Sequence, residues 1–125
     1  MRHRIPRETT LLASNNDVVC ERCLLADRPL ARMRGLLGRR ELASEEGILL
    51  QPASSVHTWF MRFPIDVVFI DRAQTIVKIV PALRPWRTAG ARKAAAALEL
   101  PAGTAAALGL EPGMSLVLAE DSETP

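Results

Sequence analysis

The segment from His57 to Asp66 holds residue types that could form a reactive site. Its sequence, HTWFMRFPID, places a histidine, an arginine and an aspartate around Pro64. A histidine has an unperturbed pKa of about 6.5 and can act as a general base near neutral pH. One hypothesis is therefore a hydrolase in which His57 is the base and Asp66 orients it, while Arg62 or backbone amides stabilise an anion.

The nucleophile that such a hydrolase needs is not marked by a motif. Ser54, Ser55 and Thr58 lie nearby, but none stands in a G-x-S-x-G elbow. His57 could equally bind a ligand or be a hydrogen-bonded structural residue.

Asp66 and Glu99 each stand between two apolar residues, which predicts that both carboxylates are buried. A buried carboxylate needs hydrogen bonds or a counter-charge. Asp66 could use Arg62 or the backbone amides at the Pro64 corner, and Glu99 could pair with Arg62 or Arg87. If both acids faced one cleft, they could do acid and base work.

The aromatic residues are few, and most lie in two places. On a continuous strand, Trp59, Met61 and Phe63 would share one face with His57, either as core or as the apolar wall of a cleft. Trp86 stands in a loop between Arg84 and Arg87. It could offer a stacking and cationic surface to a base, a sugar or a peptide, or it could cover one end of the fold.

Cys20 and Cys23 form a CxxC pair, which allows a redox, a metal-binding or a structural interpretation. Zinc usually takes four ligands, and the only histidines in the chain are His3 and His57. Residues three apart on a regular strand point to opposite faces, so we expect two structural thiols. We predict no metal and no cofactor.

The chain is 125 residues long, which suits one domain. We expect this domain at residues 9–119, between flexible tails at 1–8 and 120–125.

Sixteen basic and 14 acidic residues give a net charge of +2, so a general attraction to nucleic acid or membranes is not expected. Any such binding would be local, on an arginine face at 28–40 together with Arg84, Arg87 and Arg92. Neither a leader with a long apolar core nor an apolar run of about 18 residues occurs, which predicts a cytoplasmic protein.

Local patterns predict the elements that position these residues. Strands are expected at 17–26, 47–52, 55–61, 94–100 and 114–119, and a hairpin joins Ile65–Ile70 to Thr75–Val80 across the turn DRAQ. Helices are expected at 28–40 and within 101–110, the second starting at Gly103 or Thr104 and ending at Gly109. Residues 82–92 are expected to form a loop. The predicted fold is α+β, with a mostly antiparallel sheet curled into a small barrel-like core and two short helices.

Five segments in order resemble the domain of unknown function 192 family, over residues 20–118. They are RGLLGRREL, EEGILLQP, SSVHTWFMRFPIDVVFIDR, ALRPWR and LELPAGTAAALGLEPG. The most specific matches are His57-Thr58, Met61, Ile65-Asp66 and the run Glu99, Pro101, Ala102 and Gly103. The family has no established activity, so the resemblance bears on the fold and on the choice of candidate residues.

The leading hypothesis is a non-enzymatic binding or accessory domain for a small polar ligand or a peptide segment, because no complete catalytic, metal or phosphate-loop motif appears. Its ligand-binding residues would be His57, Trp59, Met61, Arg62, Asp66, Trp86, Arg87 and Glu99. A membrane is not an expected partner, and nucleic acid is an unlikely one. The oligomeric state cannot be inferred.

Overall fold

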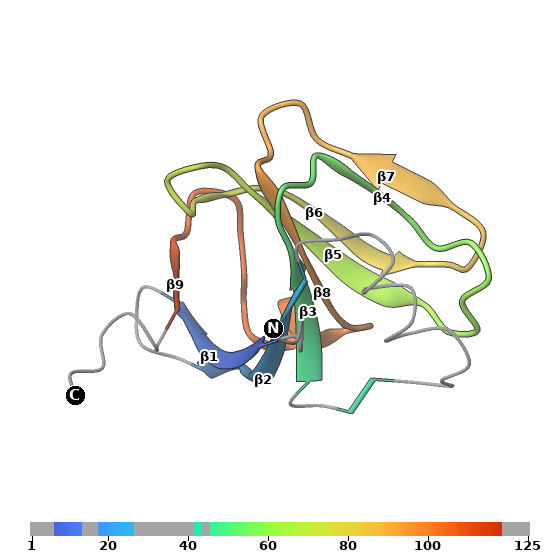
Figure 1. The fold of residues 1–125 in the computed structure, drawn as a ribbon, viewed down its shortest axis with the longest axis horizontal. Coiled ribbons are helices and arrows are strands. Elements are labelled where there is room, and N and C mark those ends of the chain that lie inside the picture. The colour runs from blue at the N-terminus through green and yellow to red at the C-terminus, as the bar shows by residue number, and fades with distance from the viewer. Residues whose placement is uncertain (1–6, 14–17, 27–41, 44–45, 119–125) are drawn as a thin grey trace, which may run out of the picture.

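The computed structural model describes residues 7–13, 18–26, 42–43 and 46–118, and within them the protein is built mainly from strands (Figure 1). The elements are β1 (Arg7–Ala13), β2 (Val18–Ala26), β3 (Glu46–Leu50), β4 (Ser55–His57), β5 (Ile65–Ile70), β6 (Ile76–Leu83), β7 (Thr88–Gly90), β8 (Ala96–Pro101), α2 (Thr104–Ala107) and β9 (Leu116–Leu118).

The strands form two sheets. The larger has the order β6-β5-β8-β3-β2-β1-β9, and β4 pairs with β7 in a separate two-stranded sheet. The ladders are antiparallel except for β2 with β3, which run parallel. Residues 27–45 join β2 to β3, and this connection has the length that a parallel crossover needs, a dozen residues or more.

The expected barrel-like core is wrong, because the large sheet is open and ends in β6 and β9. These two edges approach each other at an isolated bridge between Thr75 and Ser115. Three backbone hydrogen bonds surround this bridge: Ile76 N to Met114 O (2.8 Å), Gly113 N to Ile76 O (2.8 Å) and Leu116 N to Gln74 O (2.9 Å). Within the described residues, β9 forms its ladder with β1 and none with β6.

The α+β class is also corrected to a predominantly β fold. The part of the chain that the structure describes contains one short helix, α2, which starts at Thr104 as predicted. The predicted helix at 28–40 lies outside the described residues. The alanine-rich run before α2 is a strand, as predicted, and the five side chains from Ala96 to Leu100 are buried. Burial between two layers therefore outweighs the helix propensity of alanine here.

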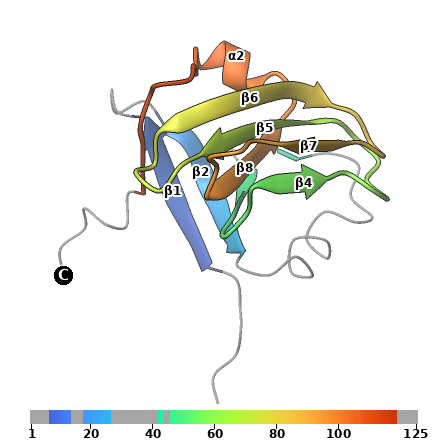
Figure 2. The same ribbon diagram turned by 90° about the horizontal axis from the view of Figure 1, so that it is seen from above.

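β5 lies at the centre of the fold, with all six side chains buried. Val68 and Ile70 face one apolar cluster, which includes Ala105 of α2. Ile65, Val67 and Phe69 face a second cluster. Figure 2 shows the result, with α2 on one side of β5 and the β4–β7 sheet on the other. The predicted hairpin of β5 and β6 is confirmed by the pairing of Val68 with Ile79.

Candidate functional site

Thr58 joins two loops that are far apart in the sequence. Its side chain is 0% exposed, and its hydroxyl donates to the Arg84 carbonyl at 2.6 Å and accepts from the Arg87 N–H at 2.9 Å. Its backbone adds bonds from Thr58 N to Arg87 O (2.8 Å) and from Trp86 N to Thr58 O (3.0 Å). The residues that follow β4 and those between β6 and β7 are thereby fixed to each other.

This junction presents three aromatic side chains to solvent, which we call the aromatic corner: Trp59, Phe60 and Trp86. They are 47%, 59% and 55% exposed, respectively. The Phe60 and Trp86 rings lie 4.7 Å apart between centroids, and Trp59 stacks on His57 at 4.6 Å. Large exposed aromatic groups that cluster in this way are typical of binding surfaces.

The backbone of the aromatic corner is held in an unfavourable conformation. Phe60 and Trp86 have φ angles of 68° and 65°, in the left-handed region that residues other than glycine rarely occupy. Such a conformation persists only where surrounding contacts impose it, and strained positions of this kind gather at functional sites. The hydrogen bonds of Thr58 supply the constraint.

The charge around the aromatic corner is positive. Arg62, Arg84 and Arg87 are exposed and lie within three residues of the aromatic side chains in sequence. Residues 51–65 and 82–90 contain no aspartate or glutamate. An anionic ligand would therefore meet guanidinium groups and no opposing carboxylate from these two segments.

Met61 and Phe63 do not belong to this surface. They are 5% and 6% exposed and pack in the second apolar cluster. The expected continuous strand ends at His57, because a turn follows in which Met61 N donates to Thr58 O at 3.2 Å. The expectation that Trp59 shares a face with Met61 and Phe63 is wrong, since the turn exposes Trp59 and buries the other two.

Asp66 serves α2 rather than His57. Its carboxylate is 1% exposed and accepts hydrogen bonds from the backbone N–H groups of Ala82 (2.8 Å), Gly103 (3.1 Å) and Ala105 (2.8 Å). Asp66 alternates with Ile65 and Val67 along β5 and therefore points to the face that α2 covers, whereas His57 belongs to the β4–β7 sheet on the opposite side (Figure 2). The arrangement does not support the hydrolase pair, and the amides differ from those expected at Pro64.

Glu99 is 0% exposed and pairs with Val67 across the β5–β8 ladder, while Asp66 pairs with Leu100. Paired residues project to the same face of a sheet, and neighbours along a strand project to opposite faces. Glu99 and Asp66 therefore point away from each other. The hypothesis of two carboxylates in one cleft is wrong.

The three arginines that the sequence proposed for nucleic-acid binding outside 28–40 lie in two places. Arg92 lines an open hollow of about 730 Å³ together with Asp71, Arg72 and Lys93. Arg84 and Arg87 flank Trp86 of the aromatic corner. Asp71 is committed to its own turn, where its Oδ1 accepts from Ala73 N and Thr75 N. The proposed arginine face at 28–40 lies outside the described residues.

The described residues bring together no three or more His, Cys, Asp or Glu side chains that could hold a metal ion. No helix among them has the length and apolar character needed to cross a membrane.

Two parts of this site have no clear signal in the sequence. Thr58 is a candidate nucleophile by its residue type, but its buried hydroxyl holds two loops together. Phe60 falls within a predicted apolar strand, because no glycine or proline marks the turn at residues 58–61.

Fold and site together define a small, predominantly β domain with an exposed aromatic and cationic surface. The chain belongs to the DUF192 family, described as "uncharacterized ACR", whose model matches residues 10–118. This confirms the resemblance seen in the sequence.

Two solved structures are similar to the chain over nearly its whole length. One is described as a "putative transcription regulator" from Sinorhizobium meliloti 1021, with 28% identity, a TM-score of 0.76 and coverage of 91% of this chain and 94% of that one. The other is a protein of unknown function from Novosphingobium aromaticivorans DSM 12444, with 24% identity, a TM-score of 0.74 and coverage of 94% and 91%. No curated protein matches the sequence.

Proposed function

We propose that this protein is a non-enzymatic binding domain, and that its aromatic corner binds a ligand that combines a flat ring with negative charge. A nucleotide has this chemistry, either free or within a single-stranded nucleic acid. The observation that carries the proposal is the exposure of Trp59, Phe60 and Trp86 on a backbone that Thr58 holds in place.

Each part of the corner has a role in this proposal. An aromatic ring can stack on any nucleobase, because every base has a flat face. The guanidinium groups of Arg62, Arg84 and Arg87 can meet phosphate oxygens in a bidentate manner. The rigid junction at Thr58 lowers the ordering cost of binding, since the rings are already presented to solvent.

This proposal narrows the set of binding residues drawn from the sequence, and it departs from the expectation that nucleic acid is an unlikely partner. Trp59, Arg62, Trp86 and Arg87 remain candidate contacts, with Phe60 added, and His57 supports Trp59 by stacking. Met61, Asp66 and Glu99 are buried and are left out of the contact surface. The description of the Sinorhizobium protein as a transcription regulator is compatible with a nucleic-acid ligand.

The chain suits a direct fluorescence test, because its two tryptophans both lie in the aromatic corner. The protein is titrated with adenosine monophosphate in one series and with a short mixed-sequence single-stranded RNA in another. We expect quenching that saturates. Preference for the RNA, with affinity that falls as salt rises, would identify the strand as the ligand rather than the free nucleotide.

Trp86→Ala removes a stacking surface while retaining Trp59 as the reporter. We expect it to weaken binding by roughly 5- to 150-fold, which corresponds to about 1–3 kcal/mol per stacked base. Arg87→Ala should also weaken binding, whereas Arg72→Ala, which removes an exposed arginine beside the separate hollow, should not. Absence of quenching by both probes, or equal losses in Arg72→Ala and Arg87→Ala, would refute the proposal.

A further inference from the structure

Cys20 and Cys23 lie apart from the aromatic corner and are 1% and 0% exposed. Along the β1–β2 ladder, Thr9 pairs with Cys23 and Leu11 pairs with Cys20. Two steps on β1 therefore correspond to three on β2, which is a bulge at residues 21–22. The bulge turns both thiols toward the same apolar cluster, so the expectation that they point to opposite faces is wrong.

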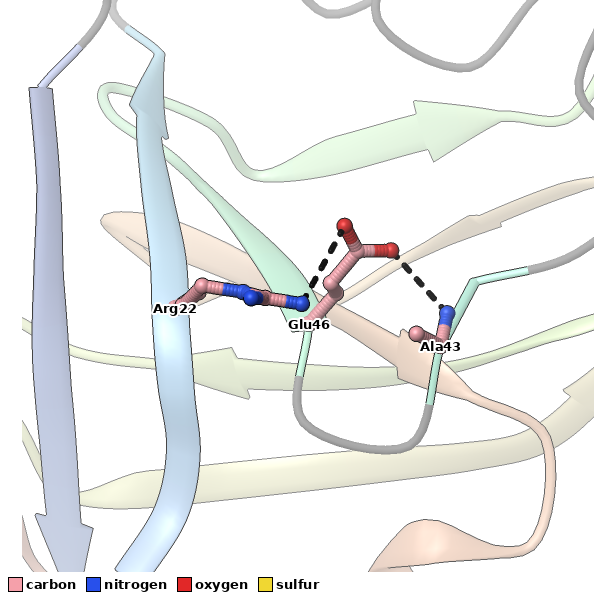
Figure 3. A network of polar contacts seen from close by, with 3 residues as sticks. All are labelled: Arg22, Ala43 and Glu46. Atoms are coloured by element: carbon pink, nitrogen blue, oxygen red, sulfur yellow. Dashed lines mark hydrogen bonds and ion pairs between the residues drawn. The ribbon is translucent and has the colours of Figure 1, made fainter.

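The two residues inside the bulge point outward. Glu21 and Arg22 are exposed, and Arg22 extends toward Glu46 at the start of β3 with an Nη2 to Oε2 distance of 3.9 Å (Figure 3). Glu46 also accepts a hydrogen bond from Ala43 N at 3.0 Å. A half-exposed pair of this kind adds little stability, but it shows that the side chain between the cysteines is directed away from the thiols.

Two observations bring the sulfur atoms together. The thiols of Cys20 and Cys23 share a hydrogen bond, and this bond together with burial raises the pKa of Cys23. Gly47 lies opposite Cys23 on β3, and a Cβ added to Gly47 would be 2.8 Å from the Cys20 Sγ. The Cys20 sulfur thus reaches over the residue that pairs with Cys23.

The surroundings favour a disulfide over a metal complex. The described part of the chain adds no histidine, aspartate or glutamate to the two thiols to form a larger donor group. A disulfide carries no charge, whereas a metal would require thiolates in an apolar core.

We propose that Cys20 and Cys23 are a modification site at which a low-molecular-weight disulfide, such as oxidised glutathione, forms an intrachain disulfide. Because both thiols are buried, the exchange takes place during local opening of the fold. One protein thiolate then attacks the oxidant, breaks its S–S bond and releases one small thiolate. The second protein thiolate then attacks the mixed disulfide and releases the other. The small disulfide is reduced to two thiols that take up the two cysteine protons, and the protein is oxidised by two electrons.

The test compares this equilibrium in the folded and the urea-unfolded protein. Both samples are equilibrated in buffers of reduced and oxidised glutathione, quenched with acid, and measured by intact mass, where the intrachain disulfide is two hydrogens lighter. We expect the equilibrium constant for forming the intrachain disulfide with oxidised glutathione to be roughly tenfold higher in the folded protein, because the fold holds the thiols together. By linkage, the oxidised protein then gains about 1.4 kcal/mol of stability for each factor of ten.

Cys20→Ala and Cys23→Ala are the matched controls, because neither variant can form the intrachain disulfide and the loss of two hydrogens should be absent from both. An equal or lower equilibrium constant in the folded protein would show that the native thiols are not positioned for a bond. Glutathione retained on both cysteines, or a disulfide between two chains, would overturn the proposal as well.

Discussion

Asp66 offers the sharpest test of the packing, because one buried carboxylate accepts three backbone hydrogen bonds from two segments of the chain, β6 and the start of α2. Oδ1 accepts from Ala82 N, and Oδ2 accepts from both Gly103 N and Ala105 N. In Asp66→Asn, one oxygen becomes an NH2 group that must face at least one of these N–H donors. The substitution therefore removes one or two bonds to a charged acceptor and places donor against donor.

Hydrogen bonds to charged groups contribute about 1.5–3 kcal/mol each, so we expect Asp66→Asn to lower the free energy of unfolding by roughly 2–4 kcal/mol. Asp71→Asn is the matched control. Asp71 accepts both of its bonds through Oδ1 alone, so an asparagine oxygen can replace it. Asp71→Asn should lower the free energy of unfolding by no more than about 0.5 kcal/mol.

Urea unfolding of both variants and the wild type gives the two free-energy differences. Amide hydrogen exchange at Gly103 and Ala105 should speed up in Asp66→Asn, because the first turn of α2 loses its acceptor. Equal and small losses in the free energy of unfolding for the two variants would refute the assignment of Asp66 as the group that joins α2 to Ala82 of β6.

Three further predictions concern single residues. Ala82 has a φ of 48°, in the left-handed region that glycine adopts more readily than alanine. Ala82→Gly should therefore raise the free energy of unfolding by about 0.5 kcal/mol, measured by urea unfolding. A loss of stability would contradict the inference that the Ala82 backbone is strained. The pKa of Cys23 is raised in the folded protein, so the thiol stays protonated there while it ionises in the unfolded chain. Below a pH of about 8.5 the Cys23 thiol is protonated in both states, and its contribution to the free energy of unfolding is constant. Above that pH only the unfolded chain loses the proton, so the free energy of unfolding should fall by up to about 1.4 kcal/mol per pH unit. Urea unfolding at several alkaline pH values should show this slope in the wild type, and its persistence in Cys23→Ala would assign it to another group. Thr58→Val keeps the shape of the side chain but removes the hydroxyl that bonds to Arg84 and Arg87. It should lower the free energy of unfolding by about 1–3 kcal/mol in urea unfolding and weaken the binding of adenosine monophosphate. An unchanged free energy of unfolding together with unchanged binding would contradict the role of Thr58.

Local patterns predicted the elements whose signals are local. The β5–β6 hairpin follows from two β-rich runs around the turn at Asp71, and α2 follows from Gly103 and Thr104. The strand expected at 94–100 is confirmed by β8, although alanine alone favours a helix. The sequence favours a strand there because the segment that follows, PAGTAAALGL, has the stronger helix pattern.

The features that could not be predicted depend on contacts between distant residues. The bulge in β2 is visible only as a shift in pairing with β1, so the common face of the two cysteines was missed. The partners of Asp66 lie 16, 37 and 39 residues away in sequence, and no short motif indicates them. The turn at Thr58 is imposed by residues 84–87, which convert an apparent strand into an exposed corner.

The central claim, that the aromatic corner is a binding surface for nucleotides, is tested most directly by NMR. The protein has two tryptophans, so its spectrum contains two indole N–H signals, from Trp59 and Trp86. Adenosine monophosphate and the single-stranded RNA are added in separate titrations, with the backbone amides of the hollow around Arg92 as an internal comparison. We predict that both indole signals move progressively and saturate in at least one titration while the amides around Arg92 stay in place. Indole signals that remain fixed at saturating concentrations of both probes would contradict the account.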